Sequence, residues 1–409
     1  MIPVPKRATR TALLLLPWIA VSIVLLLSAR WGDRTTVLRD AMIYRRAIES
    51  VRSGQGPYAA GLALQQRAWQ SGQEQQTWAF VYPPVTLPLI HIAAWMPAWL
   101  YEGLYWLAYA VGASAQLWAM FAMLKPAERR VARYLMPACF VLPAFMYSTE
   151  SLFAGNVVFI LYGAILWAAV MGWRKGDWRW FYLVVLVASC IKPQILTLLL
   201  LPPLSAAGQW LWAVLTAGGA VSIFAAQTLF FPSTYKEWRH AVDVQLMNYD
   251  REFGHGPVGV LGRVLWKRGL AWELPCAIFY LSLALLILAA LIYISRMFRA
   301  GRVSLADCVP VWLIGVVLLN PRLLGNDIFP LTIPMAAIAW RSAMDLTRSW
   351  RVTAALLLLI MLTVNVLELP HRGIVAPTVR FYALAVLLIM LCFLAGIWHV
   401  RRQASRSAI

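Results

Sequence analysis

The chain has 409 residues, of which 61% are hydrophobic and 13% are charged, and its formal net charge is +19. Soluble domains are roughly 45–50% apolar and about 25% charged, so this composition excludes an ordinary soluble protein. The Lys and Arg residues are dispersed over short loops between apolar blocks rather than gathered on one soluble face. We therefore expect no nucleic-acid partner and interpret the charge through the positive-inside bias of membrane insertion.

Long apolar blocks follow one another along the chain, and several exceed the roughly 20 residues that cross a hydrocarbon layer. They predict an all-α fold, in which residues 1–409 form a single polytopic bundle of transmembrane helices among membrane lipids. Block 11–29 is long for a signal peptide and no convincing cleavage site follows, so we expect a retained first helix. The blocks cover approximately residues 11–29, 83–98, 101–123, 135–148, 152–172, 180–191, 193–205, 210–231, 275–294, 304–320, 328–341, 352–368 and 381–399.

Short basic loops predict the topology, because Lys and Arg favour the cytoplasmic side of the inner (plasma) membrane. With the basic ends 1–10 and 400–409, they put both termini in the cytoplasm. That requires an even number of crossings, and we expect about twelve; either 83–98 enters the membrane without crossing it, or 83–123 contains a single span. The loop residues are Lys125, Arg129, Arg130, Arg133, Arg174, Lys175, Arg179, Arg296, Arg299, Arg302, Arg341, Arg348 and Arg351.

Two long segments, 30–82 and 232–274, then fall on the outer, periplasmic side. Within the first, Thr36–Val51 alternates apolar and basic residues at helical spacing, which predicts a short helix lying on the membrane surface. Asp40 lies in this helix, just past the first membrane helix. A carboxylate at that place can act as a general base toward an attacking hydroxyl, although a solvated acid paired with Arg39 or Arg45 has the same sequence pattern.

The order of several motifs resembles a known family. Asp40 with Tyr44, the turn Gly54–Tyr58 and then Tyr82-Pro-Pro84 are similar to the amino-terminal signature of glycosyltransferase family 87. These are polytopic enzymes with the GT-C fold, relatives of mannosyl- and arabinosyl-transferases that use polyprenyl-phosphate sugars. Further matches follow in the same order over roughly residues 35–335: Gly155-Asn156, Lys192-Pro193, Asn320-Pro-Arg322 and Asn326-Asp327.

The chain departs from the family pattern at three places. Ala41 stands where an aromatic residue usually follows the first aspartate. Leu324 occupies the late Pro motif without the nearby histidine of many members, and Asn326 replaces an aromatic residue. A histidine contact to the substrate therefore cannot be transferred to this chain.

The resemblance implies a glycosyltransferase that moves mannose, arabinose or another hexose or pentose from a polyprenyl-phosphate donor to a lipid or glycan acceptor, with inversion. Asp40 would be the catalytic base. The expected substrate-binding residues are Tyr44, Tyr58, Tyr82, Asn156, Lys192, Arg322 and Asp327.

Physical chemistry independently singles out Lys192, because a charged residue inside an apolar stretch usually faces a cavity and marks a functional site. Lys192 and Arg322 could neutralise the donor phosphate. The alternatives are snorkelling of Lys192, anchoring of Arg322 at the interface, and an ion pair of Asp327 with Arg322.

The sequence contains no nucleotide-binding or metal-ligand motif, and none of its five cysteines forms a Cys-x-x-Cys pair, so we expect neither metal nor cofactor. A rival interpretation is a transporter or flippase for an anionic lipid or sugar, with Lys192, Arg322 and Asp327 along its path. A membrane scaffold is the third. No internal repeat of the transporter kind is visible.

Overall fold

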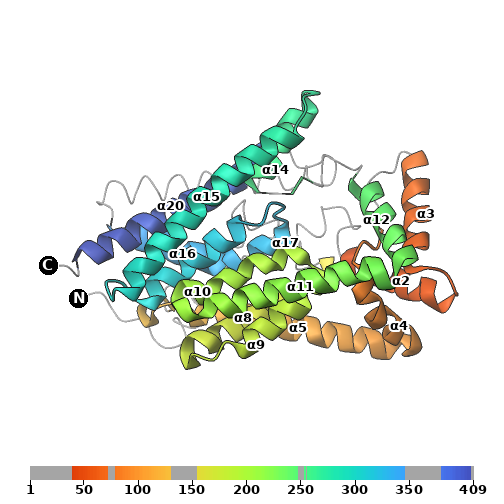
Figure 1. Cartoon of the computed structure of the whole chain (residues 1–409), viewed down its shortest axis with the longest axis horizontal. Helices are drawn as coiled ribbons and strands as arrows, with labels where there is room; N and C mark the ends of the chain where they lie inside the picture. The colour runs from red at the N-terminus through yellow and green to blue at the C-terminus, as the bar shows by residue number, and fades with distance from the viewer. Residues whose placement is uncertain are drawn as a thin grey trace, which may run out of the picture.

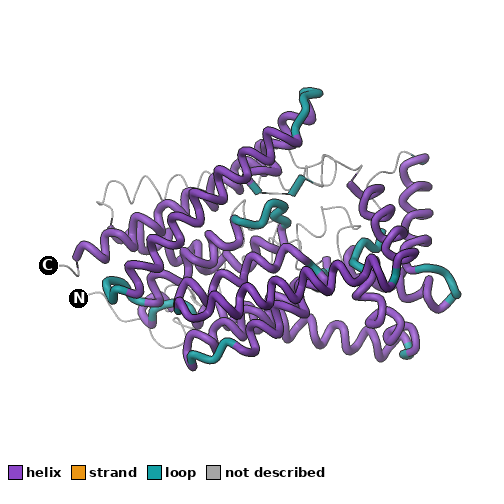
Figure 2. Tube along the Cα trace, in the orientation of Figure 1, coloured by secondary structure: helices purple, strands orange, loops and turns teal. Residues whose placement is uncertain are grey.

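The computed structural model describes residues 39–71, 79–129, 154–246, 253–254, 256–345 and 379–406. Over these residues the protein consists of helices and connecting loops without a strand, as Figure 2 shows, which confirms the all-α prediction for this part of the chain. The expected helix 11–29 and the blocks 135–148 and 352–368 lie outside the described residues.

Eight long helices form an elongated bundle (Figure 1). They are α5 (Ala98–Ala122), α8 (Val158–Lys175), α9 (Arg179–Ile191), α11 (Trp210–Phe230), α15 (Glu273–Arg299), α16 (Leu305–Leu318), α18 (Thr332–Asp345) and α20 (Val379–Arg406). Four further helices lie toward one end: α2 (Arg39–Arg52), α3 (Pro57–Gln70), α4 (Leu87–Trp95) and α12 (Pro232–Leu246). Helix α14 (Pro257–Lys267) packs against α15 and α20. Short turns complete the described part: η1 (Pro84–Thr86), η2 (Pro193–Leu200), α10 (Leu201–Ser205), η3 (Ala207–Gln209), α17 (Gly325–Ile328) and η4 (Phe329–Leu331).

Four helices in the described part are long and apolar enough to cross a membrane: Val158–Lys175, Ala207–Phe230, Glu273–Arg299 and Val386–Arg406. The total of about twelve crossings stays a prediction, since three expected blocks lie outside the described residues. The segment 83–123 divides unequally. Helix α4 has 9 residues and is about 14 Å long, too short for a hydrocarbon core of about 30 Å, whereas the 25 residues of α5 extend about 38 Å.

Helix α16 lies at the centre of the bundle. Every residue from Asp307 to Leu318 is buried, and the largest apolar cluster of the protein forms around it. Helices α11 and α15 instead expose large apolar side chains, among them Leu211, Val214, Leu281 and Leu285. A helix that is apolar on its outward face suits hydrocarbon surroundings rather than water.

Helices α5 and α8 approach each other unusually closely. A Cβ atom added at Gly163 would lie 2.3 Å from the carbonyl oxygen of Gly112, and one added at Gly112 would lie 2.6 Å from Ile160 Cα. Small residues allow such backbone contacts between membrane helices. This contact fixes the start of α8, which carries a candidate site residue, relative to α5.

The two predicted outer segments pack against each other at one end of the bundle. Helices α2, α3, α4 and α12 share a small apolar core that includes Tyr44, Tyr58 and Ala241. The indole of Trp238 in α12 donates a hydrogen bond of 2.8 Å to the carbonyl of Val81. A helix is observed here as α2, and its position on the membrane surface stays a prediction; the first expected residues, 36–38, lie outside the described part.

At the opposite end, ion pairs connect the helices, and the side chains of Arg341 and Asp307 in them are buried. Arg341 Nε lies 2.6 Å from Glu128 Oε1, and Lys125 Nζ lies 2.6 Å from Asp307 Oδ1. The prediction that Arg341 belongs to a short basic loop is wrong, because it lies within α18 and is buried. Its charge is compensated by Glu128, so it connects helices rather than facing the cytoplasm.

Candidate active site

Asp40 lies in the first turn of α2 and contacts the segment that begins α8. Asn156 Nδ2 donates a hydrogen bond of 2.7 Å to Asp40 Oδ2, although 116 residues separate the two. Arg45, one of the expected ion-pair partners of Asp40, pairs with Glu49 at 2.9 Å and with Glu102 at 3.4 Å. The carboxylate of Asp40 is therefore held by an amide donor from a distant helix start.

Gly155 makes this contact possible. Its φ of +68° is favourable for glycine alone, and an added Cβ would lie 2.9 Å from Trp106 Cη2 and 3.0 Å from Ala41 Cβ. Ala41 thus contacts this turn. It stands at the position where the family pattern has an aromatic residue. A small residue at 41 lets α2 lie close to the start of α8.

Three tyrosines that were predicted to bind substrate come together beside Asp40. The hydroxyls of Tyr44 and Tyr82 are 2.6 Å apart, and the backbone N–H of Val157 donates to Tyr44 Oη at 3.2 Å. Tyr58 is fully buried and donates to the carbonyl of Tyr82 at 2.8 Å. Tyr58 therefore positions the Tyr82 backbone, whereas Tyr44 and Tyr82 present hydroxyls near the carboxylate.

A second cluster surrounds Asp327 on α17. Lys192 Nζ lies 2.7 Å from Asp327 Oδ1, and Tyr162 Oη donates to the same oxygen at 3.1 Å. The other carboxylate oxygen accepts hydrogen bonds from the backbone N–H of Leu324 at 3.0 Å and from Asn320 Nδ2 at 3.4 Å. Asp327 is completely buried, and these donors satisfy its charge.

The break in the helix at Lys192 explains this position. Helix α9 ends at Ile191, Lys192 adopts an extended conformation with φ −137° and ψ 94°, and Pro193 starts a 3₁₀ helix. Proline disfavours the helical conformation of the residue before it. The Lys192 side chain is only 9% exposed, so it points into the protein and does not snorkel to an interface.

Arg322 lies in the loop between α16 and α17, beside the same carboxylate. Burial lowers the pKa of its guanidinium and the charge of Asp327 raises it, so the two groups are electrostatically coupled. The short segment at Gly254 lies against this loop. Its φ is +78°, and a Cβ there would lie 2.7 Å from the carbonyl oxygen of Leu323.

Tyr82 connects the two clusters. Burial raises the pKa of its phenol well above the ordinary value, and the charges of Asp40 and Asp327 raise it further. Hydrogen bonds with Tyr44 and Asn156 act in the opposite direction. The two carboxylates, predicted from motifs almost three hundred residues apart, therefore act on one phenol and belong to one region of the protein.

Sequence reasoning missed Tyr162 and placed Asn320 in a family motif without a role; both donate hydrogen bonds that hold Asp327 in place. The available signal was the hydroxyl of Tyr162 inside an otherwise apolar block, since a buried polar group in a membrane helix needs a partner. In the described ranges, no group of three His, Cys, Asp or Glu residues could hold a metal ion.

Comparison with known proteins identifies a family that this chain matches. Residues 80–321 match glycosyltransferase family 87, so the match covers more than half of the chain and includes Tyr82, Asn156 and Lys192. No curated protein matches the chain.

Proposed function

The chain belongs to glycosyltransferase family 87, and from this membership we propose that it transfers a sugar from a polyprenyl-phosphate donor to a lipid or glycan acceptor. The sugar is mannose, arabinose or another hexose or pentose. The reaction takes place on the outer face of the inner membrane, in the region between α2, α8 and α17. Family membership supports a membrane glycosyltransferase; the donor class is supported by the cationic groups beside Asp327.

In the proposed reaction, Asp40 accepts the proton of the acceptor hydroxyl while that oxygen attacks the anomeric carbon. The bond between the anomeric carbon and the phosphate oxygen breaks, and polyprenyl phosphate leaves with the bonding electron pair. Attack from the opposite face inverts the configuration. A positioned general base typically contributes about 10²–10⁴-fold to the rate.

Lys192 and Arg322 are proposed to hold the donor phosphate and stabilise the negative charge that grows on it as the bond breaks. Lysine has three N–H donors, of which the bond to Asp327 takes one. Lys192 and Arg322 bring two positive charges to the one carboxylate of Asp327, an arrangement that suits a phosphate. Asp327 orients Lys192 and compensates its charge in a buried position.

The observation that carries the proposal is the convergence at Tyr82. The charge of Asp40, a carboxylate suited to remove a proton, and the charge of Asp327, the carboxylate that pairs with Lys192, both act on this phenol. Tyr44 and Tyr82 lie between them and are proposed to contact sugar hydroxyls together with Asn156. An acceptor site and a donor site must adjoin in this way for a direct transfer.

The test is product formation by the purified protein in nanodiscs, where no second compartment exists and transport is undefined. The donors are polyprenyl-phosphate mannose, arabinose and glucose, offered with lipid and glycan acceptors. Transfer from one of them would support the enzyme. A folded protein that forms no glycosidic bond with any donor but moves lipid-linked sugar across vesicles would establish the rival transporter instead.

A further inference from the structure

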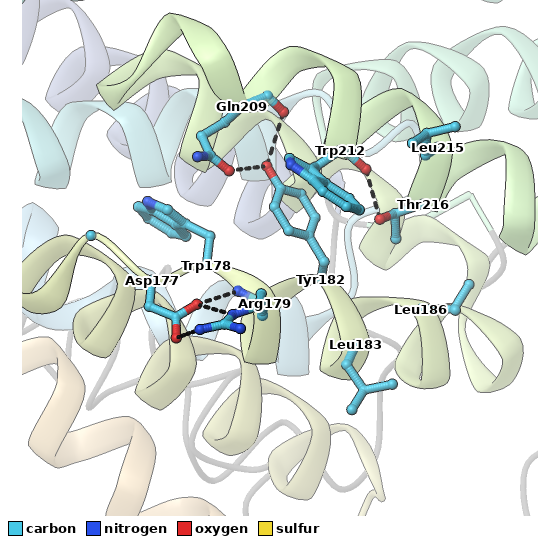
Figure 3. A pocket seen from close by; sticks show the side chains of 11 residues that line it. Asp177, Trp178, Arg179, Tyr182, Leu183, Leu186, Gln209, Trp212, Leu215 and Thr216 are labelled. Carbon is cyan, nitrogen blue, oxygen red and sulfur yellow. Dashed lines mark hydrogen bonds and ion pairs between the residues drawn. The ribbon is translucent and has the colours of Figure 1, made fainter.

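The turn between α8 and α9 borders a groove of about 570 Å³ that the proposed reaction does not use (Figure 3). It runs between α9 and α11 at the end of the bundle away from α2, α3 and α12. Asp177, Arg179 and Gln209 lie on one side of the view in Figure 3, and Leu186 and Leu215 lie on the other. The groove therefore has a polar end and an aliphatic end.

The aliphatic part opens onto an exposed apolar surface of the bundle. Leu183 and Leu215 line it and are about half exposed, and Trp212 is 56% exposed on the same helix as Leu215. A trough between two apolar helices, open along its length, matches the shape and polarity of an acyl chain. The ring of Tyr182 crosses the groove and its hydroxyl donates to the carbonyl of Gln209 at 3.0 Å.

The polar end carries an excess of positive charge. Arg179 Nε lies 3.0 Å from Asp177 Oδ1, and the Arg179 side chain is 88% exposed. The hydrogen bond from Arg179 lowers the pKa of the Asp177 carboxyl, and the charge of Lys175 lowers it further. Two cations thus face one carboxylate, while Arg174 lies over the Trp118 ring and points toward α5.

We propose that this groove binds one anionic glycerophospholipid, with its phosphate near Lys175 and Arg179 and one acyl chain between α9 and α11. Basic pockets between membrane helices are known to take anionic head groups. The occupant is a phospholipid of the leaflet at this end and not the sugar donor. The 13 residues of α9 separate Arg179 from the helix end at Lys192 by about 20 Å.

Binding can be measured by native mass spectrometry of the full chain in detergent, titrated with phosphatidylglycerol and, separately, with phosphatidylcholine. We expect the wild-type protein to prefer phosphatidylglycerol. The double variant Lys175→Gln, Arg179→Gln should bind phosphatidylglycerol more weakly, by roughly fivefold for each charge removed. Its affinity for phosphatidylcholine should stay the same. Arg296→Gln, an exposed basic residue outside the groove, is the matched charge control.

A second variant tests the groove without changing charge. Leu215→Trp fills the aliphatic part and should weaken binding of both lipids, whereas Leu285→Trp, at another exposed apolar position on α15, should weaken neither. Thermal unfolding shows that each variant is folded. Three results would overturn the proposal. The variants and their controls could lose lipid binding equally, or the wild type could show no preference for phosphatidylglycerol. The third is that polyprenyl phosphate displaces the bound lipid and phosphatidylglycerol does not.

Discussion

Lys192 and Asp327 lie 135 residues apart in the chain and form an ion pair of 2.7 Å inside the protein. The break at Pro193 ends α9 at the level where α17 begins, which brings the two charges together. The expected alternative was a pair between Asp327 and Arg322. The structure gives Lys192 as the hydrogen-bonded partner and Arg322 as a neighbouring cation.

This ion pair yields a prediction that separates folding from catalysis. Lys192→Met should destabilise the protein by about 3–5 kcal/mol, because it leaves the buried carboxylate of Asp327 without its cation. Combining it with Asp327→Asn removes both charges and should recover most of the thermal stability. Transfer should stay lost in the double variant if Lys192 binds the donor phosphate. Recovery of transfer together with stability would reduce Lys192 to a structural role.

Asp40→Asn should lower sugar transfer by about 10²–10⁴-fold while thermal stability stays near that of the wild type, because the amide keeps its size but cannot accept the proton. Initial rates with the lipid-linked donor that the wild type uses measure the effect. Glu49→Gln, in the same helix, changes an exposed carboxylate and is the control. Wild-type turnover by Asp40→Asn would eliminate this residue as the base.

Asn156→Ala should slow transfer by roughly 10–100-fold, since a hydrogen bond to a charged group is worth about 1.5–3 kcal/mol. The variant removes the donor that holds Asp40 Oδ2. The maximal rate should fall more than donor affinity does, because the base loses its orientation. If donor affinity falls and the maximal rate does not, Asn156 acts only through the proposed contact with the sugar and does not position Asp40.

Gly163→Ala should lower the unfolding temperature markedly, because the new methyl group would meet the Gly112 carbonyl oxygen at 2.3 Å and push α5 away from α8. The same change at Gly218 in α11 has open space around it and should be neutral or stabilising by about 0.5–1 kcal/mol. Thermal unfolding in one detergent compares the two. Equal unfolding temperatures of the two variants would mean that α5 and α8 can move apart without loss of stability.

Single cysteines test which side of the membrane carries the site. With the native cysteines replaced, Ser53→Cys and Ser233→Cys, both at exposed positions, should react with an impermeant thiol reagent in intact cells. Lys175→Cys at the opposite end should react only after lysis. The reverse pattern would put the candidate site in the cytoplasm and favour a nucleotide-sugar donor.

The sequence by itself determined the all-α class, the helix that holds Asp40, the helix break at Lys192-Pro193 and the family resemblance. These follow from local properties: apolar run length, amphipathic spacing and the conformation that proline imposes. Residue identity also singled out Lys192, because a charge in an apolar stretch is costly wherever the chain folds.

Only the tertiary structure decided which groups meet. The contacts of Asn156 with Asp40, of Tyr44 with Tyr82 and of Lys192 with Asp327 join residues 38 to 135 positions apart. Local propensity carries no information about such pairs; they depend on the close packing of α5 on α8 at Gly112 and Gly163 and on the interlocking of α12 with the first outer segment. The same packing buried Arg341 beside Glu128, where charge patterning alone had predicted a loop, because an ion pair compensates the cost of burial.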